Sequence, residues 1–420
     1  MKKLCFFWKI FSNTAYTARI LLCKRRFLRL TNADKAYIII GMESIYLDHA
    51  ATTPLDKAVF EKMAPYFTQM FGNADSPHAL GRKAMGAVDL ARDTVAQCIN
   101  AQSNEVYFTG GGTEADNWAV LGVARAKKAE GKTHVIVSAI EHHAVLYAAK
   151  TLEEEGFTVT YLPVNDGGRV EMNALQSALT KDTALVAIMA ANNETGVLQP
   201  IKQAADLSHE YGALFFTDAV QAAPYMPIDV KAWGVDLLSF SSHKFYGPKG
   251  CGVLYIKNGV KIHRHVGGGE QERGLRGGTL NVPSIVGFAE AYKRAVDTMQ
   301  ENNAKLQALA KVLEEKLQAV GGVTRNGDKE YVLPAVWNVK IDGVENASLL
   351  FNMDLQGVCM AAGSACASAS IKPSHVLTAM GLSEEKAKQC VRISMGKNNT
   401  QEEIERAMDI LRACVTRLRG

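Results

Sequence analysis

The sequence predicts an α/β protein built around a mostly parallel β-sheet. From about Val59 to about Met299, short apolar runs typical of buried strands alternate with stretches long enough for helices. The strand candidates are residues 135–137, 157–162, 184–189, 214–216, 237–240 and 253–256. Strands separated by helix-length segments form sheets that helices cover on both faces. Such sheets bind ligands at the carboxyl ends of their strands, so we expect the functional site there.

After Asn302 the pattern changes to that of a smaller α/β domain. A charged amphipathic stretch, residues 304–320, predicts a long helix, and residues 334–339 and 391–394 predict strands. Residues 400–419 carry glutamates early and arginines late, as expected for a closing helix. We therefore expect a large domain over residues 59–299 and a small domain formed by residues 42–58 and 300–420.

The composition is that of a soluble globular protein, with 47% hydrophobic and 21% charged residues among 420. Eight of the 47 basic residues precede Asp34, the first acidic residue. The rest of the chain therefore has 39 basic residues against 43 acidic ones, a net charge of −4. This balance lacks the charge signature of a nucleic-acid-binding protein, and no direct nucleic-acid contact is expected.

The cysteines and histidines predict neither a disulfide scaffold nor a metal site. Eight cysteines are scattered without C-x-x-C pairs, and the Glu141-His142-His143 run has no H-E-x-x-H or Cys/His cluster around it. No window reaches the roughly 18 apolar residues of a membrane span. A cytoplasmic location fits these features.

Residues 1–41 are basic and precede the domain patterns. They could be an organellar transit peptide, a poor secretory signal, or a stretch upstream of a true start at Met42. We favour the last interpretation and expect these residues to lie outside the fold.

Lys244 is the most informative residue of the chain. It follows a mostly apolar run, residues 235–238, and is enclosed by Ser241, Ser242, His243 and a Gly-Pro turn. A strand end that presents an amine among hydroxyls and an imidazole suits a lysine that forms a Schiff base beside an anion site. The alternative is an ordinary solvated lysine at a turn.

Three other segments place polar groups just past strand candidates. Asp218 ends an apolar run and could pair with a protonated pyridine nitrogen. The glycines before Thr113 lead into a helix whose first N–H groups could bind a phosphate. His142 follows residues 134–140 and could stack on a flat ring and move protons. With Asn193 and Lys244, these groups are expected to converge on one crevice.

Together, these segments resemble the cysteine desulfurases, pyridoxal-phosphate enzymes of the class V aminotransferase group. The resemblance extends from Met42 to the C-terminus. Its further marks are residues 46–54 (YLDHAATTP), 192–196 (NNETG), 267–273 (GGGEQER), 276–283 (RGGTLNVP) and 362–370 (AGSACASAS). It implies the aspartate-aminotransferase-like fold, with a mainly parallel seven-stranded sheet in the large domain, and normally a homodimer with active sites at the subunit interface.

The resemblance also implies roles for individual residues. Lys244 would carry pyridoxal 5′-phosphate, Asp218 would keep its ring nitrogen protonated, and His142 would stack on the ring as an acid/base. Arg392 would fork onto the substrate carboxylate. The other cofactor contacts would come from Gly112, Thr113, Asn193, Gln221, Ser241, Ser242, His243 and Thr279, of which Asn193 also meets the substrate and Thr279 comes from the neighbouring subunit.

Cys366 gives the predicted reaction its identity. It lies among glycine, alanine and serine, and its thiolate would take sulfur from L-cysteine, leaving L-alanine and an enzyme persulfide. The sulfur would pass to an acceptor protein for tRNA thiolation, iron–sulfur cluster assembly or both. The alternatives are a selenocysteine lyase, another class V enzyme, or a non-catalytic scaffold that binds the acceptor.

Overall fold

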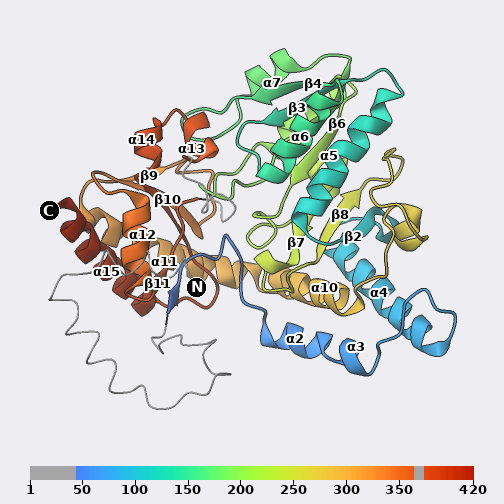
Figure 1. The fold of residues 1–420 in the computed structure, drawn as a ribbon, viewed down its shortest axis with the longest axis horizontal. Helices are drawn as coiled ribbons and strands as arrows, with labels where there is room; N and C mark the ends of the chain where they lie inside the picture. Colours follow the sequence, from blue (N-terminus) through green and yellow to red (C-terminus); the bar gives the residue numbers. More distant parts are fainter. Residues whose placement is uncertain (1–43, 364–372) are drawn as a thin grey trace, which may run out of the picture. The chain divides into compact units, whose positions relative to one another are not determined.

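Seven strands form the central sheet in the order β2-β8-β7-β6-β5-β3-β4 (Figure 1). The computed structural model describes residues 44–363 and 373–420. Two expectations, the role of residues 1–41 and the placement of Cys366, lie outside the described residues. The strands are β2 (Val106–Thr109), β3 (His134–Ser138), β4 (Thr158–Leu162), β5 (Thr183–Ala187), β6 (Leu214–Asp218), β7 (Leu237–Ser241) and β8 (Gly252–Ile256).

The sheet is mainly parallel, which confirms the predicted class. Strands β4, β3, β5, β6 and β7 pair in parallel, whereas β8 is antiparallel to both β7 and β2. The exception follows from chain length, because only residues 242–251 join β7 to β8 and a parallel return needs about a dozen residues or more. Those same residues include Lys244, so the tight return holds this lysine at the strand ends.

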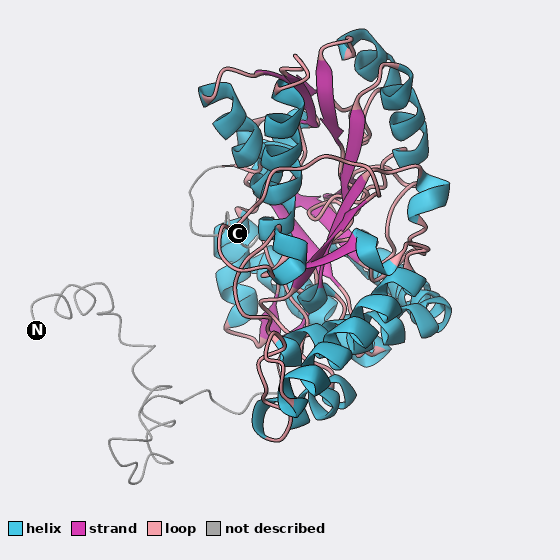
Figure 2. Ribbon diagram, turned by 90° about the vertical axis from the view of Figure 1, so that its right-hand side faces the viewer, coloured by secondary structure: helices cyan, strands magenta, loops and turns pink. Residues whose placement is uncertain are grey.

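Helices cover both faces of the sheet (Figure 2). Alternate residues of a strand point to opposite faces, and β3 shows this directly. Val135 and Val137 belong to the core beneath α5 (Gly112–Lys128) and α6 (His143–Glu154), whereas Ile136 belongs to the core beneath α4 (Ala79–Cys98) and α10 (Val282–Asp297). Strands that are buried on both faces explain why the sequence shows continuous apolar runs.

A third hydrophobic core lies under a three-stranded antiparallel sheet of order β12-β10-β9. Its strands are β9 (Val323–Asn326), β10 (Val336–Ile341) and β12 (Cys390–Ser394), and β1 (Ile45–Tyr46) pairs in parallel with β11 (Val358–Cys359) beside it. The helices α11 (Met299–Val320), α12 (Asn346–Asp354) and α15 (Gln401–Arg419) contribute to this core. The exact domain boundaries stay a prediction.

The remaining helical segments are short connections. They are α2 (Lys57–Met63), α3 (Pro65–Thr68), η4 (Ser103–Glu105), α7 (Met172–Ala178), α8 (Ile201–Glu210), α9 (Val230–Trp233), η5 (Ser242–Lys244), η6 (Gln271–Gly274), α13 (His375–Ala379) and α14 (Glu384–Ala387). Within the described part of the chain, every helix is too short or too polar to cross a membrane.

Candidate active site

A cavity of about 860 Å³ opens at the carboxyl ends of the parallel strands. It has the size and position expected for a ligand site in an open α/β sheet. Ten residues singled out from the sequence line it: Gly112, Thr113, His142, Asn193, Asp218, Gln221, Ser241, His243, Lys244 and Arg392. Residues at or just past the ends of β2, β3, β5, β6 and β7 thus meet Arg392 of β12 in one place.

The Lys244 amine is held by backbone carbonyls of the N-terminal segment. Its Nζ donates to the carbonyl oxygens of Ala50 and Ala51 at 2.6 and 2.9 Å. Thr53 donates its backbone N–H and its hydroxyl to the carbonyl of His243, each at 2.9 Å. These contacts hold residues 50–53 against residues 242–251, the turn between β7 and β8 that carries Lys244 and is called the lysine turn below. The two segments are almost two hundred residues apart in the sequence. Every residue has a backbone carbonyl whatever its side chain, so the sequence could not reveal these contacts.

His142 serves as the N-cap of α6, and this fixes its chemistry. Its Nδ1 accepts the backbone N–H of Ala144 at 3.2 Å, so a neutral ring carries its proton on Nε2. Burial, and next the nearby Lys244 cation, lower the pKa of His142 to about 4. The imidazole is therefore neutral near pH 7 and can accept or relay a proton at the cavity wall.

Asp218 ends β6 as a fully buried carboxyl. One of its oxygens accepts the backbone N–H of Val220 at 2.8 Å. Burial raises its pKa to about 6, while the Val220 N–H and the Lys244 cation act in the opposite direction. A buried carboxylate costs free energy unless a cation or donor faces it, so this site is suited to a protonated ring nitrogen.

Two further buried acids, Asp116 and Glu141, lie close enough to Asp218 to interact with its charge, and the sequence did not identify them. Asp116 on α5 accepts the hydroxyl of Ser239 at 2.5 Å, and Glu141 accepts the backbone N–H of Met189 at 2.7 Å. Burial, with repulsion from Asp218, raises the pKa of Asp116 well above its usual value; burial also raises that of Glu141. Asp116 lies three residues after Thr113 on α5, so both can face the same side of the helix. This spacing was the only sequence signal for Asp116.

The start of α5 has the features of an anion-binding site. The first N–H groups of a helix have no partner within the helix, and Gly111 has a φ of 150° that favours glycine. Glu114 accepts the backbone N–H of Gly110 at 2.8 Å and pairs with Arg276 at 2.8 Å, which braces the turn. Ser241 and His243 line the same cavity.

Within the described part of the chain, two expected site residues do not line this cavity. The buried hydroxyl of Ser242 donates to the backbone carbonyls of Pro248 and Cys251 and so closes the lysine turn, and its expected contact with the cofactor stays a prediction. Thr279 is exposed and does not line this cavity, and its proposed action on a neighbouring subunit stays a prediction. Cys366 lies outside the described residues.

Arg392 reaches the cavity from β12 as a buried guanidinium. Its Nη1 donates to the carbonyl of Asn193 at 2.9 Å, and its Nη2 pairs with Asp48 at 2.7 Å. The side chain is only 1% exposed, so this charge interacts strongly with any anion in the cavity. The arrangement can bind a carboxylate through its remaining N–H groups.

The donor set fits pyridoxal phosphate. A helix start with serine and histidine suits the phosphate, a buried carboxyl suits the ring nitrogen, and an amine suits the aldehyde carbon. No group of three His, Cys, Asp or Glu side chains within residues 44–363 and 373–420 could hold a metal ion.

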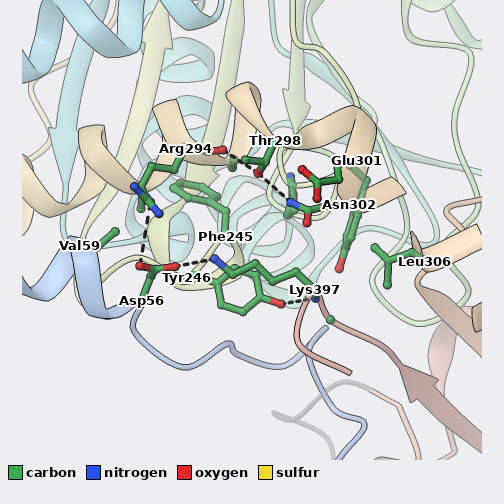
Figure 3. A pocket seen from close by; sticks show the side chains of 15 residues that line it. Asp56, Val59, Phe245, Tyr246, Arg294, Thr298, Glu301, Asn302, Leu306 and Lys397 are labelled. Carbon is green, nitrogen blue, oxygen red and sulfur yellow. Dashed lines mark hydrogen bonds and ion pairs between the residues drawn. The ribbon is translucent and has the colours of Figure 1, made fainter. Parts of the chain in front are cut away.

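A smaller cavity of about 230 Å³ lies behind the lysine turn (Figure 3). Tyr246 has a φ of 66°, which is unusual for a bulky residue, and Thr53 accepts its backbone N–H at 2.8 Å. The Tyr246 hydroxyl accepts the backbone N–H of Lys397 at 2.7 Å, and the Lys397 amine pairs with Asp56 at 2.6 Å. These contacts join the lysine turn to the loop that follows β12.

The chain is similar to known proteins over most of its length. The family described as aminotransferase class-V matches residues 45–407. Cysteine desulfurase IscS of Clostridium botulinum is 46% identical over 372 residues, which cover 88% of this chain and 94% of that protein. Putative cysteine desulfurase IscS 1 of Bacillus subtilis is 47% identical over 379 residues, or 90% of this chain and 100% of that protein. A solved NifS-like protein has a TM-score of 0.84 at 35% identity, covering 89% of this chain and 99% of its own.

Proposed function

The chain belongs to the class V aminotransferase family, and we infer that it is a pyridoxal-phosphate-dependent cysteine desulfurase whose active site is the 860 Å³ cavity. The observation that carries this inference is that Lys244, Asp218, His142 and Arg392 line one cavity at the strand ends. The relatives named above, at 46% and 47% identity over most of the chain, support the same reaction.

The residues that would hold the cofactor follow from the cavity lining. Lys244 would bind it covalently through its amine, and Asp218 would pair with its ring nitrogen. The start of α5 at Gly112 and Thr113, with Ser241 and His243, would bind its phosphate. Gln221, whose amide donates to the carbonyl of Ala50 at 2.9 Å, would lie beside the ring. When bound, the cofactor withdraws electrons from the substrate carbons and so weakens their bonds to hydrogen and sulfur.

The protein's own groups orient the substrate and move protons. Arg392 would bind the carboxylate of L-cysteine, and Asn193, whose backbone carbonyl accepts Nη1 of Arg392, would also contact the substrate. The Lys244 amine, once the substrate amine has displaced it, would take the proton from the substrate Cα. Neutral His142 would relay a proton at the same wall of the cavity.

Cys366 would accept the sulfur. Its thiolate attacks the substrate sulfur, a sulfur–sulfur bond forms, and the carbon–sulfur bond breaks with its electron pair left on the substrate carbon. Protonation of that carbon gives L-alanine. The persulfide on Cys366 then carries the sulfur to an acceptor protein.

The test is to incubate purified protein with L-cysteine and to measure alanine, sulfide and the mass of intact protein. We expect equal amounts of alanine and transferred sulfur, with the added sulfur on the Cys366 peptide. A Lys244→Ala variant serves as the inactive control. If alanine does not form, or if selenocysteine is converted and cysteine is not, a lyase of different specificity replaces this proposal.

We also propose a cytoplasmic homodimer that passes sulfur to a tRNA-thiolating enzyme or an iron–sulfur scaffold. The dimer is implied by the resemblance, in which Thr279 would act in the neighbouring subunit's site; in its own chain Thr279 is exposed and does not line the cavity. Light scattering of the purified protein gives the oligomeric state. Capture of acceptors by the persulfidated protein, compared with Cys366→Ser, tests the transfer.

A further inference from the structure

Arg392 has an ion-pair partner that does not line the cavity. Asp48 accepts Nη2 of Arg392 at 2.7 Å, and its side chain is 20% exposed whereas that of Arg392 is 1% exposed. The carbonyl of Asn193 accepts Nη1, and Nε has no partner among the described residues. The guanidinium is therefore held on two nitrogens, while a third buried N–H remains unsatisfied.

The backbone fixes Asp48 against the strand that carries Arg392. Asp48 forms a parallel bridge with Ser394, and the backbone N–H groups of His49 and Ala50 donate to the carbonyl and hydroxyl of Ser394 at 3.2 and 2.9 Å. The Tyr46 hydroxyl donates to the carbonyl of Asp48 at 3.0 Å. These backbone contacts therefore hold Asp48 beside β12, where its carboxylate pairs with Arg392.

A buried arginine needs both a counter-charge and a fixed plane. Its charge is permanent, and an unpaired buried cation is strongly destabilising. A carboxylate ligand is best bound by parallel N–H groups, so a guanidinium that turns about its long side chain loses affinity. One hydrogen bond from Nη1 to a carbonyl cannot fix the plane, whereas the second contact with Asp48 can.

We propose that Asp48 is a positioning residue that orients Arg392 for the carboxylate of the substrate. This inference rests on the proposed role of Arg392. Asp48 touches neither substrate nor cofactor; it acts by holding one side of the guanidinium so that the remaining N–H groups face the cavity. The opposite possibility is that Asp48 competes with the substrate carboxylate for the same N–H groups.

The experiment compares Asp48→Ala, Asp48→Asn and Arg392→Lys in the cofactor-loaded enzyme. L-Cysteine is compared with cysteamine, which has the same amine and thiol but no carboxylate. For Asp48→Ala we expect the KM for L-cysteine to rise about 10-fold, with kcat changed less than about 3-fold. The affinity for cysteamine, measured by the change in cofactor absorbance, should stay the same. Asp48→Asn keeps an acceptor oxygen and should give a smaller increase.

Asp409→Ala is the matched control, since Asp409 pairs with Arg412 at 3.4 Å on the exposed face of α15. It should leave all these constants unchanged. If Arg392→Lys raises the KM but Asp48→Ala leaves it unchanged or lowers it, Asp48 does not position the arginine and the proposed function stands. If neither variant alters the KM, the carboxylate role of Arg392 fails and this inference fails with it. Equal losses for cysteine and cysteamine would show a general structural role, and Asp48→Asn decides the case if Asp48→Ala does not fold.

Discussion

The amine of Lys244 lies 2.6 Å from the carbonyl oxygen of Ala50, which precedes it by 194 residues in the sequence. Ala50 is itself fixed on both sides, because its N–H donates to the Ser394 hydroxyl at 2.9 Å and its carbonyl also accepts the Gln221 amide. The same short segment therefore contacts the lysine turn and the strand of Arg392. The distance between the Lys244 amine and the Arg392 guanidinium therefore depends on this segment.

The first prediction concerns which lysine binds the cofactor. Borohydride reduction of the purified protein, followed by peptide mapping, should place the label on Lys244, because this amine lies at the strand end beside Asp218. Lys249 also lines the cavity and is the natural control. Lys249→Ala should retain the label, whereas Lys244→Ala should lose it. A label on Lys249, or no label, would overturn the assignment.

The second prediction separates two buried acids. Asp218→Asn should reduce kcat/KM on the order of 100-fold, because the ring nitrogen loses its charged partner. Asp116→Asn should stay within about 3-fold of the parent enzyme. Burial and repulsion from Asp218 raise the pKa of Asp116 well above its usual value, so an uncharged amide resembles the acid already present. The absorbance of the bound cofactor should change only in Asp218→Asn. Similar losses in both variants would show that Asp116 is charged.

The sequence predicted the sheet and ten of the residues that line the cavity because both leave local signals. Doubly buried strands give apolar runs, and the groups that follow them, such as Asp218 and Lys244, must meet at one edge. The strands β1 and β11 were not predicted, since two residues carry no periodicity, and β9 has one apolar side chain in four. A hydroxyl beside Lys244 can serve either a ligand or the turn itself, and the sequence could not show that the Ser242 hydroxyl bonds within the turn. Contacts of backbone carbonyls, such as that of Ala50, depend on tertiary structure and have no sequence pattern.

The third prediction concerns acid stability. The pKa of His142 falls from 6.5 in the unfolded chain to about 4 in the fold. Between these values the unfolded chain binds a proton that the folded chain does not, so the free energy of unfolding decreases as the pH falls through this window. His142→Asn should reduce the loss of stability between pH 7 and 5.5 by about 1 kcal/mol. Urea unfolding of the cofactor-free protein at both values measures this, with exposed His263→Asn as the surface control. An unchanged pH dependence in His142→Asn would show that the imidazole is not buried in its neutral form.

The fourth prediction tests the sulfur acceptor. Cys366→Ser should abolish sulfide release from L-cysteine, because a hydroxyl cannot take the sulfur, while the cofactor remains bound and its absorbance still responds to cysteine. Cys359→Ser is the control, since this thiol on β11 is partly buried and burial raises its pKa. It should keep full turnover. Turnover retained in Cys366→Ser would exclude the persulfide step.

The last prediction concerns the junction between β12 and the lysine turn. A Cβ on Gly396 would collide with the His49 ring and the Tyr246 hydroxyl, and Tyr246 is already held by Thr53 and Lys397. Gly396→Ala should therefore lower the free energy of unfolding by about 1–3 kcal/mol, the usual result of overpacking. It should also raise the KM for L-cysteine, because the loop that would shift follows Arg392 directly.

Gly86→Ala is the opposite control: nothing lies within 4 Å of its added Cβ on the exposed side of α4, so alanine should stabilise the helix by about 0.5–1 kcal/mol with unchanged kinetics. Urea unfolding and steady-state kinetics of the two variants measure both effects, and a Gly396→Ala protein as stable and active as the parent would show that this junction does not constrain the site.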